Sequence, residues 1–550
     1  MLWRTITALF ALLAITTVPT DAQCTKPRVR RSWTVLSSTE RQLYKDAIAS
    51  AMDSGAYIKF VEIHTEMMSE MEAHRQCMFV YWHRLLLVAF ENMLRGQGSR
   101  YACVTVPYWD WMTDYNKFIS GECNSILGCS PALGYLGGAP PRSTKAVAIN
   151  GELSVGYCEA DSPMNHFCES SRVSGRRCAK CVPRDNWGAL SFPASVSYAS
   201  VRSQIFGANN IGEMSTAIEE GAHNNVHAQL GSTMATFASP ADPVFWSHHA
   251  MVDALHSIFH KCKVGEQKLT LQEKAASVDW TSCERRNGGI FNPFDYVTMR
   301  TGFLGQNPIN ATRDSLVGRF FNGVPLQFVA LMDTRDLGSS SYSYELQGLM
   351  GTLYSTCGST APTSRVLESG GLSNTGVAQQ TPLLTPCPAS KGAAENAVIS
   401  GMTANTTTPP SMGSLVNTTE SEPSTKKVHG WLNSTDKQVK KRGGNAILEA
   451  EKMTCLFQDE CLGGVTSYTP EFKKKFGITK EPRCKRIVDR IRRKADSVKI
   501  ADWKTQMVQT FGCPQPKKTE APPAVTAAPP VAPKSSASCS GSGSGDQGSV

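Results

Sequence analysis

Residues 73–95, AHRQCMFVYWHRLLLVAFENMLR, are the stretch around which the rest of the chain is organised. His74 and His83 stand nine residues apart in it. Nine helical steps rotate a side chain by about 900°, which is half a turn out of phase. The two imidazoles therefore meet only if His74 lies on a loop and His83 begins the apolar helix that follows. His64 lies ten residues upstream of His74, on the inward face of another predicted helix, and the three together predict a metal site.

A second set of histidines strengthens this prediction. His223 and His227 in HNNVH stand at i and i+4 and share one helical face. His248 and His249 follow after SPADPVFW, whose two prolines turn the chain and bring His249 back beside the first pair. Two groups of three neutral imidazoles with open coordination positions favour copper over calcium or magnesium.

The length and the N-terminus predict a secreted protein with one large domain and appendages. The 550 residues exceed what one ordinary core needs. Residues 1–22 combine Arg4, an apolar core, and small residues at Thr20 and Ala22, which is typical of a signal peptide. No later run of about 18 apolar residues predicts a membrane span. No motif indicates a nucleic-acid partner.

The cysteines agree with an extracellular location. The chain has 18 cysteines, and in an exported protein these are expected to form disulfides. Seven of them lie between the two histidine sets and predict stapled loops. Cys178 and Cys181 have the spacing of half a zinc site, but no matching pair stands at the right distance, so disulfides are favoured. Four N-x-S/T sequons predict glycosylation, at Asn310, Asn405, Asn417 and Asn433.

Composition divides the chain into five segments. We interpret them as a signal peptide (1–22), a copper-binding domain (23–356), a disordered Ser/Thr/Pro-rich linker (357–442), a basic disulfide-bonded helical module (443–514) and a disordered tail (515–550). Within the large domain, residues 116–193 are predicted to be loops with little regular structure. Residues 265–356 are predicted to form turns and short strands that cover the core.

The C-terminal module is strongly basic. Residues 426–518 hold 22 Lys and Arg against 10 Asp and Glu, a net charge of +12 in a chain whose overall charge is +9. Four cysteines in this region allow two bridges. The charge forms either a solvated face or a surface that adheres to an acidic extracellular matrix.

The sequence resembles the tyrosinases, catechol oxidases and molluscan-type haemocyanins, which are the type 3 copper proteins. The motifs HRQCMFVYWHRLLLVAFE, VPYWDW, HNNVH and SPADPVFWSHHAMVD occur in that order, and Tyr342-Ser343-Tyr344 is similar to the tyrosine motif that closes the family's core. The resemblance implies a mainly α protein, with a four-helix bundle around a binuclear copper centre, disulfide-stapled loops and short strands. The small basic helical module adds to this core.

The resemblance also implies the residues of the site. His64, His74 and His83 would bind copper A, and His223, His227 and His249 would bind copper B, with His248 beside the site. Glu219, or alternatively Glu220, together with Asn224 would position a water molecule as the base for phenol deprotonation.

The implied activity is that of a secreted copper oxidoreductase. It would ortho-hydroxylate monophenols and oxidise o-diphenols to o-quinones with O2, in pigment synthesis, protein crosslinking or matrix hardening. Its substrates would be phenolic small molecules or tyrosyl and DOPA side chains of proteins. Three alternatives stay open: a catechol oxidase only, an oxygen-binding protein similar to haemocyanin, and a structural matrix protein.

Two departures from the family pattern concern the copper ligands. His256 stands where the family often has a tryptophan beneath copper B. No cysteine stands two residues before His74, so the thioether that many members form with this histidine is not predicted; Cys77 lies on the wrong side.

The C-terminus predicts a restraint or an anchor. Family enzymes are often made with a C-terminal segment over the copper entrance, and Lys440-Lys441-Arg442 offers a place to remove it. The long predicted linker weakens a rigid plug and favours tethering to an acidic matrix.

Overall fold

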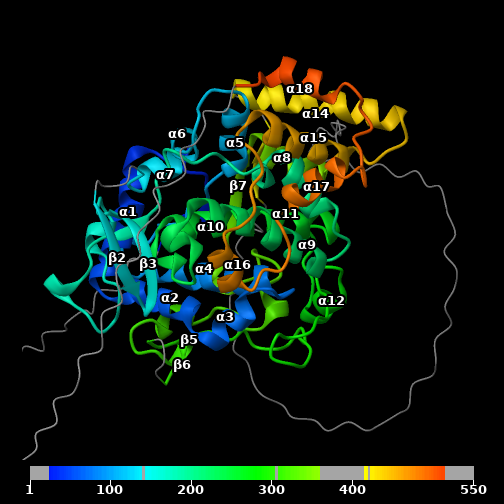
Figure 1. Ribbon diagram of the computed structural model, residues 1–550. Coiled ribbons are helices and arrows are strands. Elements are labelled where there is room, and N and C mark those ends of the chain that lie inside the picture. Colours follow the sequence, from blue (N-terminus) through cyan, green and yellow to red (C-terminus); the bar gives the residue numbers. More distant parts are fainter. Residues whose placement is uncertain (1–23, 139–142, 304–306, 359–413, 419–421, 515–550) are drawn as a thin grey trace, which may run out of the picture.

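The computed structural model describes residues 24–138, 143–303, 307–358, 414–418 and 422–514. The predicted signal peptide, most of the predicted linker and the predicted tail lie outside the described residues. The described chain is mainly helical with a few short strands, as the sequence predicted (Figure 1). No helix among the described residues is both long and apolar enough to cross a membrane.

The large domain is built from helices α1 to α13. Their bounds are α1 (Ser38–Asp53), α2 (Ala56–Thr65), α3 (Met67–Ala73), α4 (Phe79–Arg95), α5 (Trp111–Ile119), α6 (Ile126–Cys129), α7 (Pro131–Tyr135), α8 (Tyr198–Phe206), α9 (Ile211–Ile218), α10 (Asn224–Leu230), α11 (Val244–Lys263), α12 (Leu271–Ala276) and α13 (Gly348–Thr356). Helix α1 begins at a capping box in which Ser37 and Glu40 exchange hydrogen bonds, which satisfies its first free N–H groups.

Three small sheets lie around the helices. The order β1–β7–β8 joins β1 (Val29–Arg30), β7 (Ser343–Gln347) and β8 (Leu415–Asn417) in parallel. The order β2–β3–β4 joins β2 (Thr144–Ile149), β3 (Glu152–Glu159) and β4 (Val182–Arg184) in antiparallel pairs, and β5 (Arg300–Thr301) pairs with β6 (Ile309–Asn310).

The β2–β3–β4 sheet corrects the prediction that residues 116–193 hold little regular structure. Asn150 and Gly151 form the two-residue turn between β2 and β3, both with positive φ (47° and 88°). Such an Asn-Gly turn matches the twist of a hairpin. The hairpin was missed because β2 is exposed along much of its length and lies in a region rich in cysteine, glycine, serine and proline. Within residues 265–356, which are predicted to form turns and short strands, Phe328–Leu331 forms a 3₁₀ helix.

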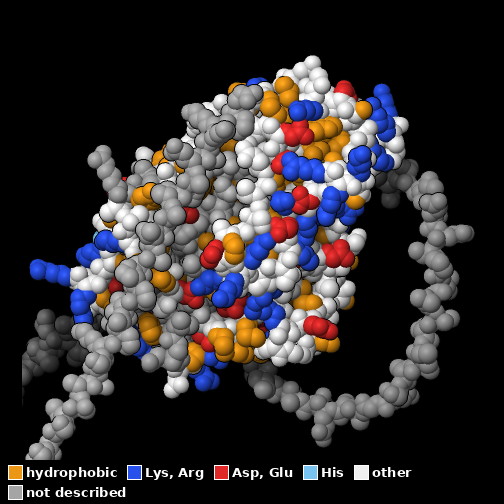
Figure 2. Space-filling view, in the orientation of Figure 1, with side chains coloured by type: hydrophobic (Ala, Val, Ile, Leu, Met, Phe, Trp, Pro, Cys, Tyr) orange, Lys and Arg blue, Asp and Glu red, His pale blue; other side chains and the backbone are white. Residues whose placement is uncertain are grey.

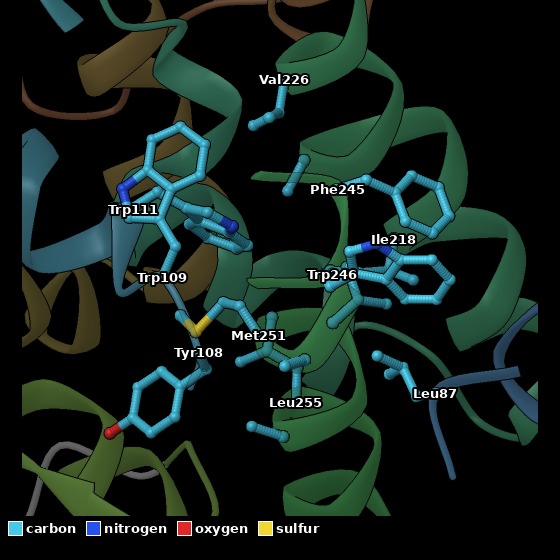
Figure 3. Packing of buried hydrophobic residues seen from close by; sticks show 14 of the residues in the cluster. Leu87, Tyr108, Trp109, Trp111, Ile218, Val226, Phe245, Trp246, Met251 and Leu255 are labelled. Carbon is cyan, nitrogen blue, oxygen red and sulfur yellow. The ribbon is translucent and has the colours of Figure 1, made fainter. Parts of the chain in front are cut away.

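The hydrophobic core lies between α4 and α11. The ring of Phe90 on α4 stacks on Trp246 of α11, with ring centroids 3.5 Å apart and planes inclined by 1°. Figure 3 shows Trp246 and Leu255 of α11 with Leu87 of α4 and Ile218 of α9 in the same packed layer. Each buried side chain of this size contributes about 1.5–3 kcal/mol. The core thus holds the histidine-bearing helices in one arrangement, because α4 packs against α2, α9 and α11.

A buried polar network joins the same two helices to β7. Asp253 of α11 accepts hydrogen bonds from Arg84 (2.6 Å), Arg30 (3.2 Å) and the hydroxyls of Tyr342 (2.6 Å) and Tyr344 (2.5 Å). Arg84 follows His83 directly, and Asp253 lies one helical turn after His249. The Tyr-Ser-Tyr motif therefore closes the domain by satisfying a buried carboxylate.

Disulfides bind the loops, as predicted. Among the described residues eight pairs form: Cys24–Cys103, Cys77–Cys283, Cys123–Cys129, Cys158–Cys181, Cys168–Cys178, Cys262–Cys357, Cys455–Cys484 and Cys461–Cys513. Cys178 and Cys181 bond to different partners, which confirms that they are not half of a zinc site.

The C-terminal module consists of five helices stapled by two of these disulfides. They are α14 (Pro423–Lys441), α15 (Ala446–Cys461), α16 (Pro470–Phe476), α17 (Arg483–Arg492) and α18 (Trp503–Phe511). Helix α14 lies inside the predicted linker, so the predicted start of the module at 443 is wrong. Its buried Val428, Trp431, Leu432 and Val439 recur at helical spacing, a signal that the polar composition around them obscured.

The module packs directly on the large domain, with α15 against α8 and α14 against α5 (Figure 1). Arg202 of α8 reaches both carboxylate oxygens of Asp436 at 3.4 Å, and both side chains are buried. Ser200 donates to Glu451 at 2.9 Å. The module is thus a docked part of the structure and does not swing on a tether in this state.

Candidate metal centre

The first group of histidines converges as the spacing predicted. His64 is the next-to-last residue of α2, His74 follows the last residue of α3 in an extended conformation, and His83 lies in the first turns of α4. Their ring centroids lie 4.9 to 5.7 Å apart. One nitrogen from each ring lies within 4.8 Å of the others, and all three side chains are buried.

The second group comes from a π-helical turn and from the helices α10 and α11. A π-helical turn over Glu219–His223 separates α9 from α10 and presents His223 beside His227, with ring centroids 4.5 Å apart. The π turn places Gly221 at ψ −111°, where a side chain would collide with Gln204. His248 and His249 of α11 complete a group whose nitrogens all lie within 4.8 Å of one another.

The two groups lie side by side. The rings of His83 and His249 stack at 4.3 Å, and His83 and His223 lie 6.1 Å apart. His248 contacts His223 and His227 at 5.4 and 5.1 Å. His249 thus lies between the groups, whereas His248 lies beside the second group; the use of His249 as the ligand stays a prediction.

Backbone carbonyls orient the imidazoles. The Nδ1 atoms of His64, His83 and His227 hydrogen-bond the carbonyl oxygens of Phe237 (2.7 Å), Phe79 (2.9 Å) and Met234 (2.6 Å). Each Nε2 then carries the lone pair. The Nε2 atoms of His64, His83 and His223 are buried without a hydrogen-bond partner. Orphaned acceptors of this kind are costly, and a metal ion at the point where they converge satisfies them.

Burial keeps the ligands in the form that binds metal. Desolvation holds the pKa values of His64, His83, His223 and His249 well below 6.5 and lowers that of His227 to about 4. These rings are therefore neutral at neutral pH. Three phenylalanines, Phe79, Phe237 and Phe245, contact the imidazoles and exclude water from the centre.

Comparison with known proteins decides the family. Residues 54–261 match the model of the common central domain of tyrosinase, and this range contains every histidine of both groups. Residues 54–261 thus form a central domain of the tyrosinase type, which is that of the type 3 copper proteins. The centre is accordingly a binuclear copper site, with copper A at the first group and copper B at the second.

The relatives are distant. The chain is 29% identical to a tyrosinase of Streptomyces glaucescens over 235 residues, which cover 41% of this chain and 80% of the relative. It is 28% identical to a tyrosinase of Aspergillus flavus over 269 residues, covering 46% and 69%. Among solved structures, a polyphenol oxidase of Thermothelomyces thermophila is 18% identical with a TM-score of 0.38, covering 59% of this chain and 90% of that one.

The two predicted base residues both lie in the segment that carries His223. Glu219 is buried in the π turn, and its Oε1 accepts a hydrogen bond from the backbone N–H of Arg75 at 2.7 Å. Burial raises the pKa of Glu219 to about 8. Asn224 Oδ1 lies 3.0 Å from His223 Nδ1. Glu220, the alternative, instead turns outward and pairs with Lys480 at 2.9 Å.

Helix α16 of the module covers the copper A side of the centre, a feature that sequence reasoning missed. The ring of Phe476 lies 6.1 Å from His74 and 4.7 Å from Phe237. Phe472 stacks behind it at 4.5 Å. The flexible-linker argument against a plug is therefore wrong for this state. Thr469 and Pro470 are recognisable helix-start signals, but nothing near them in sequence indicates where the helix docks.

Further contacts hold α16 in place. Lys475 pairs with Glu152 of β3, and Lys480 and Arg486 both approach Glu220. Tyr468 lies against α10, where Asn225 Nδ2 donates to its hydroxyl at 2.9 Å. Gly477 ends the helix at φ +58°, and a side chain there would collide with the Arg75 guanidinium. The module thus contacts Arg75, the residue that follows His74.

His256 supports the helix beneath copper B without a hydrogen bond. Both of its ring nitrogens are buried without partners, and its ring meets Tyr81 edge-on at 4.9 Å. Burial, with smaller contributions from Arg84 and His260, lowers the pKa of His256 well below 6.5. This agrees with the predicted packing role.

Replacing His256 with phenylalanine is expected to make the copper-free protein less sensitive to acid. The unfolded chain takes up a proton as the pH falls through about 6.5, whereas the folded chain does so only at lower pH, so this residue costs stability below about 6.5. As the pH falls below about 6.5, the free energy of unfolding should decrease in both proteins. The decrease in the variant should be smaller than in wild type by about 1.4 kcal/mol per pH unit. Urea unfolding between pH 7.5 and 5 measures this pH dependence of the free energy of unfolding. His166→Phe, at a partly exposed site, is the control. Parallel curves for H256F and wild type would contradict the assignment.

Proposed function

We propose that this chain is a secreted tyrosinase that ortho-hydroxylates monophenols and oxidises o-diphenols to o-quinones with O2. The predicted signal peptide and the disulfides support secretion. When bound, the two coppers supply the redox chemistry, binding O2 and accepting electrons from the phenol. The chain itself holds the ligands neutral, excludes water and manages the proton of the substrate.

The observation that carries the monophenol activity is the buried carboxyl group of Glu219, four residues before His223 in the π turn. Hydroxylation requires a phenol to lose its proton near the coppers, and a general base works best when its pKa lies near the working pH. Burial brings the pKa of Glu219 to about 8, well above that of an exposed glutamate. With Asn224 bonded to His223 through Oδ1, the Nδ2 group of this amide is available to hold a water molecule.

The bond from Arg75 N–H to Glu219 links the base to the copper A side. Arg75 follows His74 directly, so the carboxyl group is oriented by the same loop that presents a ligand. Glu220 differs from Glu219 in this respect, because its charge is already paired with the module.

Replacing Glu219 with glutamine, or Asn224 with aspartate, is expected to lower the monophenol rate more than the catechol rate. A catechol already carries the second oxygen and depends less on a base in this position. General acid–base assistance contributes about 10²–10⁴-fold, so the ratio of the two rates should fall by about 100-fold. Initial rates with a matched monophenol and catechol measure this ratio.

Glu220→Gln is the matched control. It changes the neighbouring carboxylate, which contacts Lys480 and Arg486 and not the centre. Any change in access to the site should alter both rates together and leave their ratio as in wild type. An unchanged ratio in E219Q and N224D would remove the base assignment, whereas a wild type that oxidises catechols but no monophenol would favour the alternative of a catechol oxidase.

We further propose phenolic small molecules, or tyrosyl and DOPA side chains, as substrates, and an acidic matrix as a partner of the module. Figure 2 shows Lys and Arg side chains gathered along the side of the molecule that carries the module, with acidic side chains among them. Arg490, Arg493 and Lys494 near the end of α17 are exposed. A polyanion would bind there in a salt-sensitive way.

A further inference from the structure

The His74 loop is the least self-supporting part of the copper centre. His74 and His249 are the two predicted ligands whose Nδ1 has no hydrogen-bond partner. His249 is held inside the long helix α11, but His74 lies beyond the end of α3. Its Nδ1 is 3.7 Å from Glu70 Oε1, too far for a hydrogen bond.

The backbone of this loop is also unfavourable. Arg75 adopts φ +57°, the left-handed region that residues with side chains seldom occupy. A cavity of about 600 Å³ adjoins the loop and is lined by Arg75, Gln76 and Cys77. Packing therefore restrains one side of the loop poorly, and other contacts must hold it.

Those contacts come from the segment after α12. Cys283 forms a disulfide with Cys77, three residues after His74. Arg286 Nη1 donates to the carbonyl oxygen of His74 at 3.2 Å and to Glu70 Oε1 at 2.9 Å, and lies 3.4 Å from the Glu70 carbonyl oxygen. The disulfide and the arginine together hold the loop at both ends of residues 74–77.

We propose that Cys77–Cys283 and Arg286 form a brace that positions His74 for copper A. Arg286 is a positioning residue: it acts on the ligand through the His74 carbonyl and does not reach the metal. The brace performs the task that a carbonyl bonded to Nδ1 performs for His64, His83 and His227. This inference rests on the binding of two coppers by the centre.

The test measures copper release from the full-length, copper-loaded protein into a chelator. Wild type should release its two coppers slowly. Arg286→Gln and the pair Cys77→Ala with Cys283→Ala should each release one copper per chain at least about tenfold faster, because loss of groups that orient a ligand weakens metal binding by about 10–100-fold. The other copper should leave at the wild-type rate. Arg286→Lys should restore much of the retention, since one ammonium can reach the same oxygens.

Controls separate the brace from general stability. Arg285→Gln removes an ion pair to Glu72 and Asp295 without touching residues 74–77, and Cys24→Ala with Cys103→Ala removes a disulfide elsewhere. Both should release copper as wild type does. In the copper-free protein, amide hydrogen exchange at residues 74–77 should accelerate in R286Q and not in R285Q.

The outcomes are distinct. A wild-type chain without copper would end the proposed function itself. A wild-type chain with two coppers, combined with brace variants that release both at control rates or lose both together, would overturn the brace alone. If the cysteine pair fails to fold, R286Q and R286K still decide the question.

Discussion

Replacing His227 with alanine is expected to leave about one copper per chain and to abolish phenol oxidation. His227 is buried, its Nδ1 is bound to the Met234 carbonyl, and its Nε2 faces His249 at 3.5 Å. Without it, the second group would offer copper only two predicted ligands, and the pair of coppers that would supply the redox chemistry would be incomplete. Because changes outside the ligands already cost about 10–100-fold, the catechol rate should fall by more than about 100-fold.

His83→Ala should likewise leave about one copper per chain, here through loss of copper A, and should abolish phenol oxidation. His83 lies in α4 and stacks on His249 across the centre, so its loss also disturbs the link between the two groups. His166→Ala is the control, because this histidine pairs with Asp53 at the surface. Metal analysis gives copper per chain, and circular dichroism confirms folding. Full catechol activity in either ligand variant would refute the assignment of these two groups as the catalytic centre.

Replacing both Phe472 and Phe476 with alanine is expected to raise the catechol rate of the intact chain by at least about tenfold. The two rings are buried against Phe237 and the His74 side of the centre. Truncating a buried phenylalanine typically costs about 3–5 kcal/mol, and each 1.4 kcal/mol is a factor of ten in an equilibrium. The docked position of α16 should therefore lose most of its free-energy advantage over an undocked position, and phenols should reach the coppers.

Trp503→Ala is the matched control for this prediction. It removes a large aromatic side chain from α18 of the same module, on the far side from the centre (Figure 1). Its catechol rate should equal that of wild type. High salt should also raise the wild-type rate, because the pairs of Lys475 with Glu152 and Lys480 with Glu220 are partly exposed and screened.

The same variants separate the plug from the tether. Equal catechol rates in wild type and in F472A/F476A would show that α16 does not limit access. The module would then retain its proposed role as an anchor, tested by salt-dependent retention on a polyanionic matrix. The two roles are compatible, since α16 lies at the centre and the exposed arginines lie at the end of α17.

Cleavage at Lys440-Lys441-Arg442 takes on a specific meaning in this arrangement. These three residues are exposed at the end of α14. Both disulfides of the module lie beyond them, and no described disulfide joins the module to the large domain. A cut there would leave α15 to α18 held by non-covalent contacts alone. Release, and with it activation, would then depend on how firmly these contacts hold.

Neighbouring residues were enough to predict the parts of the centre that depend on helical geometry. His223 and His227 at i and i+4 had to share a face, and His83 at the start of an apolar helix had to point into the core. The half-turn mismatch between His74 and His83 required a loop, which the structure has at the end of α3. The family motifs added the assignment of two coppers, since their order along the chain carries more information than any one of them.

Contacts between distant segments were beyond such reasoning. Met234 O and Phe237 O orient His227 and His64, Glu219 meets Arg75 across 144 positions, and Arg75 meets Gly477 across 402. Phe476 has no local feature that distinguishes it from Phe472 or from any other buried ring. Periodicity along a chain determines which side chains share a face, because backbone geometry is the same everywhere. Which faces then meet depends on the packing of whole helices, to which many weak contacts contribute at once.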